Sequence, residues 1–84
     1  MSGRVLIDFT PGDGAVVRML GLVERRGYVV RRVAMEEHAG KGSMILDLEP
    51  RDSSRRVDVV VRQLGRLIDV KSVSIVTPNP GPRP

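Results

Sequence analysis

The order of strand-like and helix-like patterns repeats within this chain of 84 residues. An alternating segment at 4–9 precedes a glycine turn, an amphipathic helical pattern and a second strand pattern at 28–37. A weaker second unit has an alternating segment at 43–49, a turn, a helical pattern at 57–67 and a strand pattern at 70–76. Two strand–helix–strand units in so short a chain predict a single compact domain.

Alternation of apolar and polar residues marks the strands and indicates which face is buried. In the second strand pattern the alternation slips near Arg31-Arg32, which predicts a β-bulge there. Residues 39–42, Ala-Gly-Lys-Gly, predict a flexible hairpin loop before the third strand. The strand residues predicted to face the core are Val5, Ile7, Phe9, Met44, Leu46 and Leu48. The last strand is marked by Val70, Val73 and Ile75.

Each helical pattern carries one apolar stripe along a single face. We expect Asp13 to cap the first helix, Gly21 to let that helix approach the sheet closely, and Gly27 to end it in a left-handed conformation. The stripes consist of Ala15, Met19, Leu22 and Val23 in the first helix and of Val57, Val60, Val61, Leu64 and Leu67 in the second.

The order strand, helix, strand, strand, helix, strand is that of the ferredoxin-like α+β fold. Right-handed crossovers place both helices on one face of a four-stranded antiparallel sheet. Residues 1–76 are predicted to form this domain, and the proline-rich residues 77–84 to form an extended, flexible tail. The apolar residues expected on the other face of the sheet, or at an interface, are Leu6, Val29, Ile45 and Val76.

Small size and missing cysteines limit how this domain is stabilised. A chain of this length buries only about 60% of the surface that it exposes when unfolded, and no disulfide or thiolate metal site can add support. We therefore expect pairing with a second copy or another subunit. The chain has no signal-peptide pattern and no apolar run near the roughly 20 residues that span a bilayer, so a cytoplasmic protein without membrane contact is expected.

The residue types do not support catalysis by this chain alone. The only histidine, His38, lies beside the predicted hairpin loop, and the adjacent Glu36 and Glu37 point to opposite faces of a strand. Two aromatic residues are too few for a base-stacking RNA platform. The net charge of +4 comes mainly from arginines such as Arg18 and Arg62 on polar helix faces, which we interpret as solvated surface.

The turn Gly12-Asp13-Gly14 is the feature that most resembles a binding site. Backbone N–H groups at the start of a helix can hold an anion, such as the carboxylate of an amino acid. A plain tight turn capped by Asp13 explains the same residues, so both interpretations stay open on spacing alone.

Several short motifs lie at the helix ends and in the last strand. They are Gly14-Ala15-Val16, Gly21-Leu22-Val23-Glu24-Arg25-Arg26-Gly27-Tyr28, Arg62-Gln63-Leu64, Leu67-Ile68-Asp69-Val70 and Val73. In order and spacing these motifs resemble the ACT domain, a small amino-acid-sensing module. The resemblance is strongest to the small regulatory subunits of acetolactate synthase (acetohydroxyacid synthase), in their short, ACT-only type. It covers residues 4–76, with Arg66 where that family commonly has lysine.

This resemblance implies a regulatory function with no catalytic residue in the chain. Members of that family bind a large catalytic subunit, which uses thiamine diphosphate, Mg²⁺ and FAD to condense pyruvate. They raise its activity in branched-chain amino acid biosynthesis. ACT domains usually pair side by side into one eight-stranded sheet, which agrees with the homodimer expected from the small core.

The resemblance also implies where an effector would bind. Many family members bind valine through an asparagine in the first loop, the helix-opening glycine and an asparagine after the Gly-Tyr turn. The glycine matches Gly14, but the asparagines align with Pro11 and Val29, which cannot accept a bond from the ligand ammonium. Two unpaired polar groups, at roughly 1–3 kcal/mol each, would weaken binding about a hundredfold or more. Weak or absent valine feedback is therefore expected. If the ligand site is retained, its residues are Pro11, Gly12, Asp13, Gly14, Ala15 and Val29.

Two other functions stay open. The first is a free-standing ACT domain that senses another amino acid or small ligand where two copies meet. The second is a basic ferredoxin-like protein that binds nucleic acid, the least favoured class of partner because the sequence offers no stacking platform.

Overall fold

The structure, a computed structural model, describes residues 3–52 and 56–76. These residues form strands and helices in the predicted order. The elements are β1 (Gly3–Phe9), α1 (Ala15–Arg25), β2 (Tyr28–His38), β3 (Lys41–Pro50), α2 (Val57–Leu64) and β4 (Val70–Val76). The proline-rich tail predicted over 77–84 lies outside the described residues, so the domain boundary at residue 76 stays a prediction.

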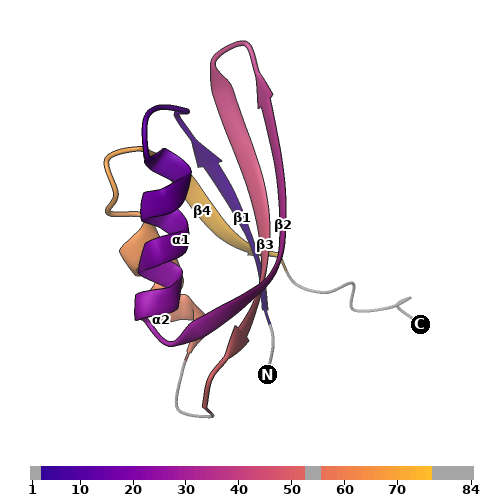
Figure 1. Ribbon diagram of the computed structural model, residues 1–84, viewed down its shortest axis with the longest axis vertical. Coiled ribbons are helices and arrows are strands. Elements are labelled where there is room, and N and C mark those ends of the chain that lie inside the picture. The colour runs from indigo at the N-terminus through magenta and orange to yellow at the C-terminus, as the bar shows by residue number, and fades with distance from the viewer. Residues whose placement is uncertain (1–2, 53–55, 77–84) are drawn as a thin grey trace, which may run out of the picture.

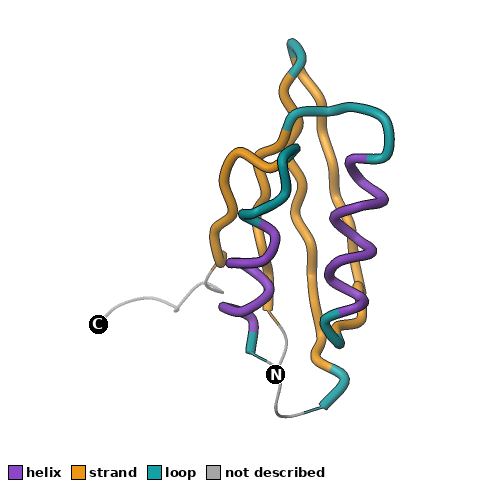
Figure 2. The backbone as a smooth tube through the Cα atoms, turned by 90° about the vertical axis from the view of Figure 1, so that its left-hand side faces the viewer, coloured by secondary structure: helices purple, strands orange, loops and turns teal. Residues whose placement is uncertain are grey.

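The strands form one antiparallel sheet in the order β2-β3-β1-β4, with β3 and β1 at its centre (Figure 1). Both helices lie against the same face of this sheet (Figure 2). α1 packs against β2, α2 packs against β4, and the two helices contact each other. The predicted ferredoxin-like α+β fold is therefore confirmed. Neither helix of the described part of the chain is long and apolar enough to cross a membrane.

The core lies between the two central strands and the two helices. Alternate residues of β1 and β3 point toward the helices, as the period of two predicts, and are almost completely buried. The helix residues that meet them come from the predicted apolar stripes. The buried residues are Val5, Ile7, Phe9, Ala15, Met19, Leu22, Val23, Tyr28, Met44, Leu46, Leu48, Val60 and Leu64.

The two ends of α1 are set by glycine rather than by a capping side chain. Gly14, not Asp13, occupies the N-cap position, with a left-handed φ of 76° that glycine adopts without steric cost. Gly27 is also left-handed and follows the helix, as predicted. A Cβ on Gly21 would meet only the Arg25 guanidinium, at 3.2 Å, so the expected close approach of Gly21 to the sheet is wrong.

The second strand–helix–strand unit differs from the sequence prediction at the end of α2 and in how far β4 is buried. α2 ends at Leu64, and Leu67 lies in the following loop. Leu67 still packs against the core as a partly buried side chain, which explains why its spacing fitted a helical stripe. Ile75 of β4 lies opposite Val5 and faces the helix side, but it is 48% exposed because β4 is an edge strand.

The bulge predicted in β2 is confirmed. The register against β3 shifts between Val30 and Arg32, which leaves Arg31 as the extra residue. The extra residue restores the phase, so that Val33 and Met35 face the helix side of the sheet opposite buried β3 residues. Without the bulge, strict alternation would have turned these two apolar side chains to the other face.

The β2–β3 hairpin is tighter than the flexible loop predicted over residues 39–42. Ala39 and Gly40 form the turn between the two strands, and both have the positive φ that two-residue hairpin turns require. Gly42 belongs to β3 and is buried. The ring of Phe9 lies against it, and a Cβ at this position would come within 2.5 Å of the ring atom Cζ.

No described helix or strand covers the face of the sheet away from the helices, called here the open face. The strand register places Leu6, Val29, Ile45 and Val76 on this face, as predicted. Leu6 and Ile45 lie opposite each other at its centre, and Ile45 also lies opposite Ala34 of β2. The centre of the open face is therefore apolar.

We expect Gly42→Ala to destabilise the fold by about 1–3 kcal/mol, because the added methyl group must displace the buried Phe9 ring. Urea unfolding followed by circular dichroism measures the change. The control is Gly65→Ala, since Gly65 has helical φ and ψ and the nearest atoms to an added Cβ lie 3.6 Å away. An unchanged midpoint for Gly42→Ala would contradict this packing.

Candidate functional site

The turn between β1 and α1 presents backbone donors at the surface. Gly14 accepts from the Arg18 N–H at 2.9 Å, and Gly12 accepts from the Ala15 N–H at 3.1 Å, which closes the first turn of the helix. The first N–H groups of a helix have no carbonyl partner within it, and the helix dipole favours negative charge there. Gly12, Asp13 and Gly14 are exposed. The turn therefore has the geometry of an anion-binding helix start.

Arg18 and Asp69 form an ion pair beside this turn. Arg18 Nε donates to Asp69 Oδ2 at 2.8 Å, and one terminal nitrogen of the guanidinium also donates to the same oxygen. The other terminal nitrogen lies 3.0 Å from where a Cβ on Gly14 would stand. The Thr10 N–H donates to the Asp69 carbonyl at 2.8 Å, so Asp69 connects the β1–α1 turn to the loop before β4.

Sequence reasoning missed this pair. It placed Arg18 on a solvated helix face and assigned no role to Asp69. The four-residue spacing from Gly14 to Arg18 could have indicated that both lie on one side of the helix. No spacing along the chain relates Arg18 to Asp69, because they come from different strand–helix–strand units.

The structure brings together five of the six predicted site residues and separates the sixth. Val29 lies near the start of β2, opposite Glu49, at the end of the sheet away from the hairpin tip. The turn lies at the other end of α1, whose eleven residues span about 16 Å. A ligand that touches both the turn and Val29 would need Val29 from a second copy. The five residues that lie together are Pro11, Gly12, Asp13, Gly14 and Ala15.

Apolar side chains are exposed along the β2 side of the molecule. Val33 and Met35 face the helix side but are each 44% exposed. The β2–β3 hairpin projects beyond the ends of the helices, which leaves its outer part uncovered on that face (Figure 1). This edge is therefore a candidate contact surface.

Arg4 and Asp47 form a bidentate ion pair on the open face. Arg4 Nε donates to Asp47 Oδ1 at 2.6 Å, and Nη2 donates to Oδ2 at 3.2 Å. These hydrogen bonds, with the charges of Arg4 and Arg32, lower the pKa of the Asp47 carboxyl and outweigh partial burial, which raises it.

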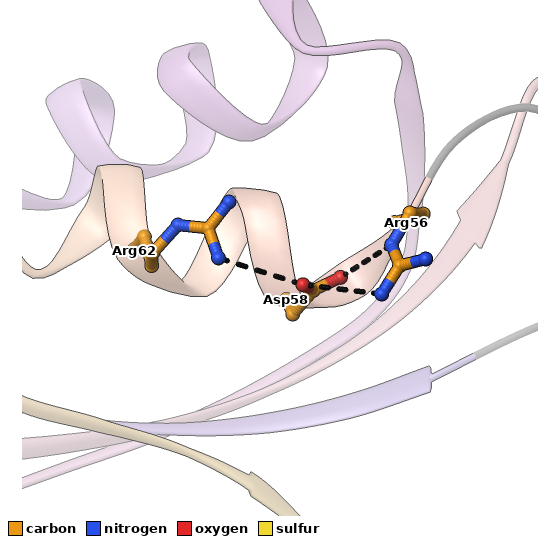
Figure 3. Close-up of polar contacts among 3 residues, drawn as sticks. All are labelled: Arg56, Asp58 and Arg62. Atoms are coloured by element: carbon orange, nitrogen blue, oxygen red, sulfur yellow. Dashed lines mark hydrogen bonds and ion pairs between the residues drawn. The ribbon is translucent and has the colours of Figure 1, made fainter.

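A second charged cluster lies at the start of α2. Asp58 pairs with Arg56 at 3.1 Å and with Arg62 at 3.5 Å, one helical turn away (Figure 3). The hydrogen bond from Arg56 is the main reason that the pKa of Asp58 is lowered. A carboxylate in the first turn also complements the helix dipole, so we assign this cluster to helix stability rather than to chemistry.

The acidic and histidine side chains of residues 3–52 and 56–76 are not clustered as in a metal site. In that part of the chain, no group of three or more acidic or histidine side chains could hold a metal ion. His38 is exposed at the end of β2, opposite Lys41. Glu36 and Glu37 face opposite sides of the sheet, as predicted, since they pair with consecutive β3 residues.

Comparison with protein families agrees with the fold. The sequence model of a family described as ACT domain matches residues 11–73, from the β1–α1 turn into β4. A search of curated proteins found no match.

Solved structures with the same fold come from several kinds of protein. The acetolactate synthase small subunit from Thermotoga maritima has a TM-score of 0.77 and 18% identity, over 95% of this chain and 50% of that one. The ACT domain from GTP pyrophosphokinase of Chlorobium tepidum has a TM-score of 0.75 and 12% identity, over 90% and 97%. An ACT domain protein from Streptococcus pneumoniae has a TM-score of 0.71 and 11% identity, over 89% of each.

We expect Arg4→Gln to raise the pKa of Asp47 toward its ordinary value, because the hydrogen bonds from Arg4 are the largest cause of its depression. Carboxyl-carbon NMR of Asp47 during an acid titration measures this directly. The pair stabilises the fold above the ordinary pKa of an aspartate, and this contribution is lost as the pH falls through the lowered value. An Asp47 titration that is identical in both proteins would contradict the assignment.

Proposed function

The chain belongs to the ACT-domain family, and from that premise we propose that it is the small regulatory subunit of an acetolactate synthase. In this role it binds the large catalytic subunit and raises its activity in branched-chain amino acid biosynthesis. Thiamine diphosphate, Mg²⁺ and FAD would be held by the catalytic subunit, and this chain would contribute contacts rather than reacting groups.

One observation carries this proposal. The motifs that resemble the acetolactate synthase small subunits coincide with structural junctions of this chain. Gly14 is the left-handed N-cap of α1, Gly27 is the left-handed residue before β2, and Asp69 ties the last loop to the first turn. The small subunit from Thermotoga maritima has the same fold over 95% of this chain, which is consistent with the proposal.

We further propose that the chain works as a homodimer with a weakened effector site. A second copy would cover the exposed apolar edge at β2, where Val33 and Met35 lie. Antiparallel pairing through this edge would bring Val29 of one copy toward the Gly12–Gly14 turn of the other. A valine site built there would lack two amide side chains, at Pro11 and Val29.

A free-standing ACT sensor is the second candidate. The ACT domain protein from Streptococcus pneumoniae, which aligns over 89% of each chain, favours this alternative because the match covers most of both proteins. Nucleic-acid binding has less support, since Phe9 and Tyr28 are both buried and neither can stack on a base.

Co-expression with the acetolactate synthase catalytic subunit of the same genome tests the proposed function. We expect the two chains to purify together and the catalytic subunit to form acetolactate faster with this chain than alone. A free-standing sensor would neither purify with the catalytic subunit nor change its rate. Either of those negative results would contradict the regulatory-subunit proposal.

Calorimetry with valine tests the weakened effector site. We expect the unaltered chain to lack a micromolar Kd, because Pro11 and Val29 offer no amide to the ligand. The double variant Pro11→Asn/Val29→Asn should bind valine with a Kd at least about a hundredfold lower than that of the unaltered chain. The control adds Gly14→Ala, which a left-handed N-cap does not tolerate, and should abolish the gain. Micromolar binding by the unaltered chain would refute the weak-feedback hypothesis.

A further inference from the structure

Charge is unevenly distributed between the helices and the rest of the chain. Segments 15–26 and 56–66, called here the helix layer, hold both helices and the residues at their ends, and they carry six arginines against two carboxylates, Glu24 and Asp58. The rest of the described chain carries six cations against eight carboxylates. Because both helices lie on one face of the sheet (Figure 2), one side of the molecule is basic and the remainder slightly acidic. The six arginines are Arg18, Arg25, Arg26, Arg56, Arg62 and Arg66.

Contacts at Gln63 of α2 gather four of these arginines. Arg26, which follows α1, donates from Nη2 to the side-chain oxygen of Gln63 at 3.3 Å. The Arg66 N–H donates to the Gln63 carbonyl at 3.1 Å. Arg25 and Arg62 are the chain neighbours of Arg26 and Gln63. The C-terminal ends of the two helices therefore share one cationic cluster, the helix-end cluster, which consists of Arg25, Arg26, Arg62 and Arg66.

Most of this charge is not neutralised within the described chain. Arg25, Arg26 and Arg66 are exposed and form no ion pair with another described residue. Arg62 lies 3.5 Å from Asp58, but that carboxylate already accepts two hydrogen bonds from Arg56, the shorter at 3.1 Å (Figure 3). The helix-end cluster therefore has guanidinium groups available for carboxylates of another molecule.

Two exposed apolar side chains lie beside the same layer. Val17 of α1 is 73% exposed, and Ile68 in the loop after α2 is 95% exposed. Each directly precedes a member of the Arg18–Asp69 pair, which holds these two segments together. Neither segment of the helix layer contains lysine. Arginine and apolar side chains without lysine are typical of surfaces that bind other proteins, in which arginine is enriched and lysine depleted.

We propose that the helix layer docks on the catalytic subunit, through the helix-end cluster together with Val17 and Ile68, and that the surface it meets is acidic with exposed apolar side chains. This inference rests on the proposed function and deepens it by naming the surface and the chemistry of its partner. Charge complementarity orients two proteins as they approach and raises their rate of encounter. The same acidic surface repels the β2–β3 hairpin, where Glu36 and Glu37 lie.

A nucleic acid fits this layer less well. Asp58 and Asp69 lie among the arginines and each binds at least one of them, so the layer alternates in sign. A phosphate backbone presents only negative charge, whereas a folded protein surface also offers donors that these carboxylates can accept. Val17 and Ile68 have no function against phosphates but can be buried against apolar side chains of a protein.

Charge reversal in the presence of the catalytic subunit tests the proposal. The variant Arg25→Glu/Arg66→Glu reverses two cations of the helix-end cluster that hold no carboxylate of the described chain. We expect the concentration of this chain that gives half-maximal activation to rise about tenfold or more, with the rate at saturation unchanged. Added salt should weaken the binding of the unaltered chain more than that of the variant, because exposed charges are screened.

The matched control is Lys41→Glu/Lys71→Glu, which changes the net charge by the same amount at exposed strand positions outside the helix layer. It should leave the half-maximal concentration unchanged. If reversal at Arg25 unfolds α1, Arg25→Gln/Arg66→Gln should still fold and show a smaller rise. Equal half-maximal concentrations for helix-layer variants and unaltered chain, or an equal rise in the control, would overturn the docking surface and leave the proposed function standing. A chain that neither binds nor activates the catalytic subunit would overturn both.

Chemical modification of arginine locates the contact independently. In the complex, phenylglyoxal should modify Arg25 and Arg66 more slowly than in the free chain, and Arg4 of the open face at an unchanged rate. Protection of Arg4 without protection of Arg25 and Arg66 would place the catalytic subunit on the open face and overturn the proposal.

A random-sequence single-stranded oligonucleotide tests the other kind of partner. Fluorescence anisotropy should show no difference in its binding between the unaltered chain and Arg25→Glu/Arg66→Glu. Tight binding that this variant abolishes would assign the helix layer to nucleic acid and overturn the proposal.

Discussion

Burial of a single face of the sheet is the constraint on which this structure depends. The inward residues of β1 and β3, Tyr28 of β2 and the stripes of two short helices form the core, and nothing in the described chain supplies a second apolar layer. A domain of this size has little stability to spare. No described element covers the other face or pairs with either edge strand, so this architecture is suited to contact with another protein.

Local pattern was enough to predict most of the fold. Val5, Ile7 and Phe9 alternate cleanly because β1 lies at the centre of the sheet and has one covered face. The slip near Arg31 was readable as a bulge for the same reason, since the apolar residues on both sides had to reach one face. The second helix was predicted to reach Leu67 because an apolar loop residue that packs on the core can have the same spacing as a helix residue.

The candidate site was less predictable because its contacts join distant parts of the chain. The glycine turn is visible in the sequence, but the left-handed φ of Gly14 is visible only in the structure. The Arg18–Asp69 pair depends on how the two units pack, and Val29 lies away from the turn for the same reason. Sequence alone offers the glycine turn and Val29 as candidate site residues but does not reveal the Arg18–Asp69 pair.

Asp69 links the two strand–helix–strand units through hydrogen bonds. Its carboxylate binds Arg18 of α1, its carbonyl accepts from Thr10, and the next residue begins β4. An effector anion at the turn would compete with this carboxylate for the Arg18 guanidinium. Asp69 therefore joins the start of α1 to the start of β4, the edge strand farthest from β2.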